Sequence, residues 1–335
     1  MFTNLRHRRR LDHLTKDAPH PTCGHAETIG YVRKYGSQTF ACPRFRRPVP
    51  ATALRVTLFL LAYVLILLVA SLPKGLAPQP LADVVWGGVA SVALLVLTRW
   101  VLTREGRAWR DVGLDVDGGT LPRLVAGVAI GAAVYGVTLG LLSLTLGPLS
   151  ISSAAWPSAT IWLRVTASFL ALACMEELGF RAYALRTLVG AVGSWPAQLA
   201  IAVAFGLSHR LFGRAWLTIL LGVIPSALRF GVVAVRSGGL AMPIGVHAAL
   251  NVAQWMVGAK ESPGIWTLDM DPSHVARMAT FAPYVSLTVT VLAALMIAGW
   301  PARRRAAAGG SAAAIVTARN VSLSPQVVAA AELGR

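Results

Sequence analysis

The sequence predicts an all-α protein, a polytopic membrane helical bundle with about eight transmembrane helices. Of its 335 residues 55% are hydrophobic and only 13% are charged, whereas a soluble domain carries about 25% charged residues. The apolar residues form continuous runs, several of which approach or exceed the roughly 17–25 residues that span a bilayer as a helix. A transmembrane β-barrel would show alternating apolar and polar residues instead, so helices are predicted.

Residues 1–50 are polar and contain ten Lys or Arg residues. No apolar run follows the first basic cluster closely, so we expect no cleavable signal peptide. The composition predicts a disordered basic tail on the cytoplasmic side, whose cluster Arg6–Arg10 contacts anionic lipid headgroups. Cys23 and Cys42 lie in the same tail, at a spacing that is not typical of a zinc site.

Residues 51–158 are predicted to hold the first three transmembrane helices. Prolines close the first apolar run, and a connection rich in arginine separates the second run from the third. The third run has glycines at a spacing that lets helix backbones approach closely. The three runs are Val56–Leu72, Leu81–Thr98 and Leu124–Leu146.

Residues 159–258 form the segment in which we expect a catalytic core of four further spans. The fourth span begins near Ala159 and continues as an amphipathic helix through Arg186, and the next three are Ala197–Leu211, Ala215–Val235 and Leu240–Val257. Residues 259–300 then supply an outer loop and the last span, Ala279–Trp300. A flexible cytoplasmic tail, 301–335, is expected after it.

The net charge of +17 predicts contact with a lipid surface rather than with nucleic acid. Basic residues crowd the cytoplasmic loops of membrane proteins, and no recognised nucleic-acid-binding motif accompanies the charge here. Placing both termini inside also puts Arg303–Arg305 and the arginine-rich connection inside. Arg210 and Arg214 then lie outside, which is the one poor fit to an N-in, C-in topology.

Few polar residues interrupt the apolar spans, and they gather within about eighty positions. A charged side chain at bilayer depth costs roughly 2.5–3.5 kcal/mol on insertion scales, so such residues mark packing contacts or functional sites. Glu177 and Arg181 are four residues apart and share a helix face, while Glu176 points about 100° away from Glu177. The full set is Glu176, Glu177, Arg181, His209, Arg229, His247 and Asn251.

These residue types suit the activation of water for hydrolysis. A desolvated glutamate is a better general base, and a histidine beside an asparagine can donate hydrogen bonds to a developing oxyanion. His247 and Asn251 are four residues apart and present one face. The same side chains could instead bind a divalent metal such as zinc, for which Glu176, His209 and His247 are the candidate ligands.

Three short motifs resemble those of the CPBP family, which comprises the CAAX prenyl protease type 2 and bacteriocin-processing (Abi) intramembrane endopeptidases. They are Glu176-Glu177-x-x-x-Arg181, Phe205-x-x-x-His209 and His247-x-x-x-Asn251, and the resemblance covers about residues 161–257. It implies that Glu176, helped by His209, activates the attacking water, and that Glu177 pairs with Arg181. It also implies that His247 and Asn251 stabilise the oxyanion and that Phe205 shapes the cavity.

The motifs leave the metal requirement open, because a metal-free glutamate mechanism uses the same residues; we favour the metal-free form. The predicted function is an intramembrane endopeptidase acting on a membrane-associated or prenylated protein or peptide. The alternatives are a non-catalytic immunity or scaffold protein and a proton-coupled transporter, although we find no convincing internal repeat of the kind common in transporters. The bias toward Arg, Ala and Gly favours a bacterial plasma membrane.

Overall fold

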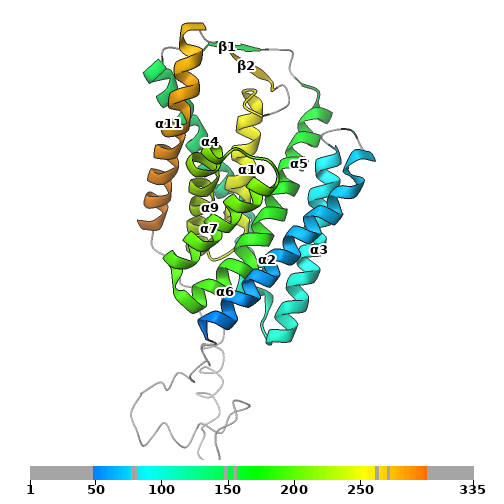
Figure 1. The fold of residues 1–335 in the computed structure, drawn as a ribbon. Helices are drawn as coiled ribbons and strands as arrows, with labels where there is room; N and C mark the ends of the chain where they lie inside the picture. The colour runs from blue at the N-terminus through cyan, green and yellow to red at the C-terminus, as the bar shows by residue number, and fades with distance from the viewer. Residues whose placement is uncertain are drawn as a thin grey trace, which may run out of the picture. The chain divides into compact units, whose positions relative to one another are not determined.

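The computed structural model of the protein describes residues 48–76, 78, 81–146, 150–153, 157–260, 264–269 and 272–299. The predicted tails, 1–50 and 301–335, lie outside these residues except for positions 48–50, where the first helix begins. The all-α prediction is confirmed, since helices account for nearly all of the described chain (Figure 1).

Eight long helical segments follow one another in the described chain, each at a place where an apolar run predicts one. Two of them contain a π-helical turn, η3 between α5 and α6 and η4 between α8 and α9. The helices are α2 (Val49–Ser71), α3 (Leu81–Glu105), α4 (Thr120–Leu146), α5 (Ala159–Glu177), η3 (Leu178–Ala182), α6 (Tyr183–Val192), α7 (Ser194–Leu211), α8 (Trp216–Thr218), η4 (Ile219–Val223), α9 (Ile224–Ser237), α10 (Ala241–Met256) and α11 (Pro272–Gly299), with short 3₁₀ turns η1 (Leu72–Leu76) and η2 (Trp109–Val112).

Six of these segments are long and apolar enough to cross a membrane, which makes the chain an integral, multi-pass membrane protein. They are Val49–Ser71, Leu81–Glu105, Thr120–Thr145, Ala159–Val192, Trp216–Ser237 and His274–Gly299. The other two, α7 and α10, are shorter, with 18 and 16 residues. Eight spans with both termini inside therefore stay a prediction, of which six spans are supported by length and composition.

A short antiparallel ribbon, which the sequence analysis does not predict, joins two connections. Strand β1 (Ser150–Ser153) pairs with β2 (Trp266–Asp269), with Ser150 opposite Asp269 and Ser153 opposite Trp266. The ribbon links the segment that precedes α5 to the segment that follows α10. It thereby connects the region before the start of α5 with the region after the end of α10, the two helices that carry Glu176 and His247.

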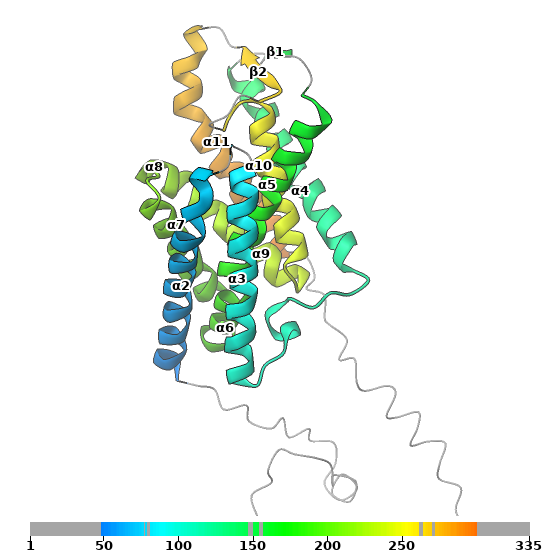
Figure 2. The same ribbon diagram turned by 90° about the vertical axis from the view of Figure 1, so that its right-hand side faces the viewer.

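Glycines bring α4 and α10 into backbone contact. A methyl group on Gly127 would lie 2.2 Å from the Met242 carbonyl oxygen, and one on Gly131 would lie 2.5 Å from the Val246 carbonyl oxygen. Gly136, farther along α4, faces open space. The predicted close approach is therefore confirmed for the first half of α4, and it places α10 against α4, α5 and α9 (Figures 1 and 2).

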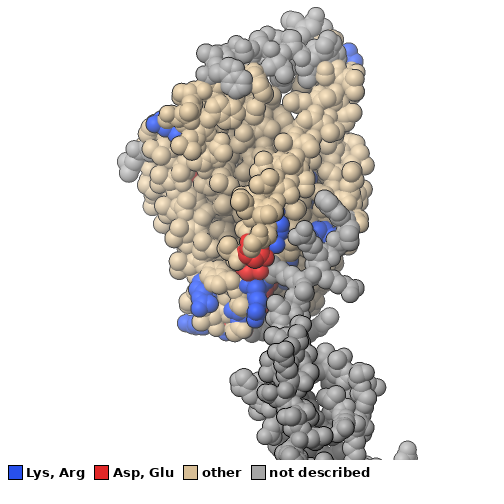
Figure 3. Space-filling model, turned by 180° about the vertical axis from the view of Figure 1, so that it is seen from behind, with Lys and Arg blue, Asp and Glu red and all other residues tan. Residues whose placement is uncertain are grey.

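The charged residues concentrate where α2 begins, α3 ends and α9 ends. Arg55 on α2 lies 3.2 Å from Glu105, the last residue of α3, and the Arg186 guanidinium donates a hydrogen bond of 2.6 Å to the Ala234 carbonyl on α9. Figure 3 shows most Lys and Arg atoms of one face in the lower part of the view, below a broad uncharged region. We call the region at the start of α2 and the ends of α3 and α9 the basic end of the bundle.

Candidate active site

The glutamate doublet ends α5, and its second member forms a fully buried ion pair. Arg181 Nη1 lies 3.3 Å from Glu177 Oε1, and both side chains have no exposed surface. This pairing across four residues agrees with the expected one, and it removes the cost of an isolated charge in an apolar interior. Glu176 is directed elsewhere, retains 19% of its side-chain surface, and accepts no hydrogen bond within the described residues.

His247 on α10 lies between the two carboxylates. Its Nδ1 is 3.0 Å from Glu177 Oε1, and its Nε2 is 3.6 Å from Glu176 Oε2. Because Glu177 pairs with an arginine and its oxygen accepts, His247 Nδ1 must carry the hydrogen of this bond. The imidazole stacks on Phe230 of α9, with ring centroids 4.4 Å apart and planes 14° apart, so its orientation is set from two sides.

The helix changes from α-helical to π-helical geometry between Glu177 and the residues that follow α5. The five residues of η3, directly after Glu177, form a π-helical turn, and single π-turns inside α-helices often occur at functional sites. Gly179 within this turn lies against Tyr63 of α2, at a place where a methyl group would be 2.5 Å from the ring. The sequence analysis, which continues one regular α-helix through Arg186, does not foresee this turn.

Aromatic rings surround the Arg181 guanidinium. Its central carbon lies 4.5 Å from the Phe205 centroid, 5.7 Å from that of Phe180 and 5.5 Å from that of Phe230. The guanidinium also donates a hydrogen bond of 3.2 Å to the Ala227 carbonyl. Cation–π contacts in a desolvated place contribute about 2 kcal/mol or more, so Arg181 connects α7 and α9 to the π-turn that directly follows the carboxylates.

Two further polar residues are not joined to the carboxylates in the described chain. His209 Nδ1 lies 3.0 Å from the Phe205 carbonyl one turn earlier, and because a carbonyl can only accept, this nitrogen carries the hydrogen. His209 Nε2 is then left as an acceptor. Arg229, which is 2% exposed, donates instead to the Thr290 hydroxyl on α11 at 3.1 Å.

Lys260 is a residue of this region that the sequence analysis misses. Its Nζ donates a hydrogen bond of 2.9 Å to Asn251 Oδ1 and lies 5.9 Å from the Phe169 ring centroid on α5. The bond orients the asparagine amide, with Oδ1 toward the lysine and Nδ2 available to donate elsewhere. No pattern could have revealed it, since Lys260 lies beyond the end of α10 and reaches back along the helix.

Of the candidate metal ligands, only Glu176 and His247 are in contact in the described chain. Among the described residues, no group of three or more His, Cys, Asp or Glu side chains has an arrangement that could hold a metal ion. Glu176 and His247 are neighbours, but no contact joins His209 to either of them, and His247 Nδ1 is already bound to Glu177. The metal requirement therefore stays open, and the chemistry below uses protein groups alone.

One of the comparisons with known proteins finds a related family. Residues 157–253 match the family model described as type II CAAX prenyl endopeptidase Rce1-like. This segment is therefore similar to an Rce1-like domain. The search of curated proteins finds no match, and the search of solved structures finds none either.

The Rce1-like domain begins just before α5 and ends within α10, so it contains all six predicted site residues: Glu176, Glu177, Arg181, His209, His247 and Asn251. The match confirms the resemblance noted in the sequence. It supports an intramembrane protease function of the CAAX type. Lys260 lies outside the domain, although it contacts one of its residues.

Proposed function

We propose that the protein is an intramembrane endopeptidase that hydrolyses a peptide bond of a membrane-associated or prenylated protein, with water activated by Glu176. The observation that carries the proposal is the pair of adjacent carboxylates with different environments. Glu177 is buried, paired with Arg181 and bound to His247, whereas Glu176 is partly exposed and accepts no hydrogen bond from the described protein. Adjacent carboxylates in unlike environments suit different roles.

In the proposed reaction Glu176 accepts a proton from water while the water oxygen attacks the carbonyl carbon of the substrate. His209 Nε2, left as an acceptor by its bond to Phe205, takes the second hydrogen bond of that water. The carbonyl π bond opens to an oxyanion, the C–N bond then breaks, and the proton held by Glu176 passes to the leaving nitrogen. A positioned base of this kind contributes about 10²–10⁴-fold to the rate.

The proposed oxyanion stabilisers are His247 and Asn251, which present one face of α10. When the imidazole carries hydrogens on both nitrogens, Nδ1 donates to Glu177 and Nε2 donates to the oxyanion. Asn251 donates from Nδ2, because its Oδ1 is held by Lys260. Fixed donors of this type are each worth about 10²–10³-fold in kcat. In this scheme the buried Glu177–Arg181 pair acts indirectly, because Glu177 holds Nδ1 and thereby orients the imidazole.

Cleavage of a farnesylated peptide that ends in a CAAX sequence tests the proposal. The purified protein in detergent is mixed with the fluorescently labelled peptide, and products are separated by chromatography. Glu176→Gln is expected to lower kcat at least about 10²-fold. Asp83→Asn, which neutralises a carboxylate on α3 outside the site, is the matched control and is expected to retain the rate. Normal turnover by Glu176→Gln would contradict the proposal.

Two further arms of the same assay test its finer parts. An unprenylated peptide of the same sequence shows whether the lipid group is required. A chelator is expected to leave the rate unchanged, and a loss of activity that added zinc restores would overturn the metal-free form. The Arg-, Ala- and Gly-rich composition supports a bacterial plasma membrane as the location, and fractionation of the host cell checks it.

A further inference from the structure

A cavity that is separate from the candidate active site opens at the basic end of the bundle. It has a volume of about 260 Å³ and lies where α7 begins and where α9 and α11 end. None of its lining residues belongs to the glutamate and histidine cluster. The lining consists of Ser194, Trp195 and Gln198 from α7, Val232, Val235 and Arg236 from α9, and Ala298 from α11.

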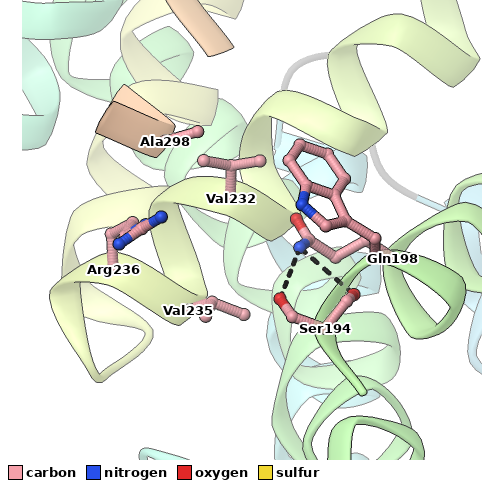
Figure 4. Close-up of a pocket in the computed structure, with 7 residues that line it drawn as sticks. Ser194, Gln198, Val232, Val235, Arg236 and Ala298 are labelled. Atoms are coloured by element: carbon pink, nitrogen blue, oxygen red, sulfur yellow. Dashed lines mark hydrogen bonds between the residues drawn. The ribbon is translucent and has the colours of Figure 1, made fainter. Parts of the chain in front are cut away.

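The cavity has polar side chains on two sides and apolar side chains between them. Figure 4 shows Arg236 and Gln198 on opposite sides, with Val232 and Val235 between them. Such a combination of a cation, an amide and apolar contacts is typical of ligand sites, which place a few polar groups on an otherwise apolar lining.

Gln198 is the observation that points to a ligand. The residue is only 4% exposed, and its Nε2 donates to the Ser194 carbonyl at 3.2 Å and lies 2.9 Å from the Ser194 hydroxyl. Because a carbonyl can only accept, the atom that faces Ser194 must be the amide nitrogen, and Oε1 points away from Ser194. Oε1 is buried and has no hydrogen-bond partner in the described chain. A buried acceptor without a donor costs about 1–3 kcal/mol, so a ligand that supplies a donor is favoured here.

The position of the cavity indicates that the ligand comes from the membrane. Trp195 is 53% exposed, and tryptophan is enriched at the membrane–water interface. Leu199, one turn beyond Trp195 on α7, and Leu295, one turn before Ala298 on α11, are also exposed. Both lie one turn farther from the basic end on helices that line the cavity, so they offer exposed apolar side chains to an acyl chain.

We propose that this cavity binds the headgroup of a phospholipid that carries a hydrogen-bond donor beside its phosphate, such as phosphatidylglycerol or phosphatidylethanolamine. The phosphate contacts the Arg236 guanidinium, and a glycerol hydroxyl or the ethanolamine ammonium donates to Gln198 Oε1. This oxygen lies against Gly231 with almost no accessible surface, so the amide turns toward the cavity when the lipid binds. Basic pockets between transmembrane helices bind lipid headgroups in this way. The volume lies slightly below the roughly 300–1,000 Å³ of sites for whole small molecules, which suits a headgroup whose chains stay outside.

Gln198 makes the cavity selective for lipids whose headgroup carries a hydrogen-bond donor. The choline headgroup has the same phosphate, but its quaternary ammonium has no N–H or O–H to donate. Phosphatidylcholine would therefore leave Gln198 Oε1 without a partner, whereas the two donor-bearing lipids satisfy it. The hydrogen bond to Gln198 Oε1 corresponds to about a tenfold higher affinity for the donor-bearing lipids than for phosphatidylcholine.

Native mass spectrometry of the detergent-solubilised full chain tests the proposal. The protein is titrated with phosphatidylglycerol, phosphatidylethanolamine and phosphatidylcholine of identical acyl chains, and with free glycerol phosphate. Both donor-bearing lipids are expected to bind about tenfold more tightly than phosphatidylcholine. Arg236→Gln is expected to weaken phosphatidylglycerol binding about tenfold, and Gln198→Leu to reduce the preference over phosphatidylcholine to within about twofold. Arg110→Gln, with the same charge change at the same end but outside the cavity, is the matched control.

Each part of the proposed site is contradicted by a different result. Equal affinity for all three lipids, or unchanged binding in both cavity variants, overturns the site. Equal affinity for phosphatidylethanolamine and phosphatidylcholine overturns the role of Gln198. Free glycerol phosphate binding as tightly as the lipid overturns the membrane source. Should Gln198→Leu not yield a monodisperse protein, Val235→Phe fills the cavity instead, and it must lower the affinity for the donor-bearing lipids about tenfold.

Discussion

Replacing Glu177 by glutamine is expected to destabilise the protein, whereas the same replacement at the adjacent Glu176 leaves its stability nearly unchanged. Removing one member of a buried ion pair costs about 3–5 kcal/mol. Arg181 keeps its hydrogen bond to Ala227 and its contacts with three aromatic rings, so the lower figure, about 3 kcal/mol, applies. Glu176 has no hydrogen bond to lose, and its replacement should cost less than about 1 kcal/mol.

Thermal unfolding in detergent, followed by tryptophan fluorescence, measures the difference. A change of 1 kcal/mol shifts the midpoint by about 2–4 °C for chains of 150–250 residues. The Glu177→Gln variant should therefore melt about 6–12 °C below the wild type, and the Glu176→Gln variant within about 4 °C of it. Both variants should lose peptide cleavage, so stability alone distinguishes their roles.

The double variant Glu177→Gln with Arg181→Met provides the control. Removing both charges abolishes the unpaired guanidinium, and replacing a buried pair by apolar side chains is often nearly neutral. Part of the lost stability should therefore return, and the cycle isolates the coupling of the pair. If the Glu176→Gln variant were the unstable one, or if both variants melted alike, the assignment of Glu177 to structure and Glu176 to chemistry would be wrong.

Three other predictions concern the surroundings of the site. Gly127→Ala is expected to cost about 1–3 kcal/mol, because the new methyl group overlaps the α10 backbone, whereas Gly136→Ala, facing open space, should keep or slightly raise the melting temperature. Lys260→Met is expected to lower kcat with little change in KM by releasing the asparagine amide, and Lys260→Arg should retain most of the rate; equal rates in all three proteins would contradict this role. Asp117 accepts a hydrogen bond from Arg123, which lowers the pKa of that carboxyl, so its stabilising effect is present above the ordinary carboxyl pKa and is lost as the pH falls through the lowered one. Carbon-13 NMR of labelled aspartate should show Asp117 titrating below the other exposed aspartates, and an ordinary midpoint would refute the contact.

The sequence by itself determined the fold class, the order of the helices and the residues of the candidate site. Long apolar runs can satisfy their backbone in a membrane only as helices, so eight helical segments appear where the runs predict them. The Glu177–Arg181 pair was also predictable, because it depends only on the period of one helix. The tails lie outside the described residues, so the proposed contact of Arg6–Arg10 with lipid stays a prediction.

Only the tertiary structure decided which of these side chains meet. His247 contacts Glu177 across 70 positions because glycines seat α10 against α4 and Phe230 supports its ring. The π-turn after Glu177, the reach of Lys260 back to Asn251 and the buried acceptor of Gln198 without a donor depend equally on neighbouring helices. Periodicity assigns a residue to a face of its own helix, but the partner of that face is set by how closely the backbones pack, and a run of apolar residues does not encode that distance.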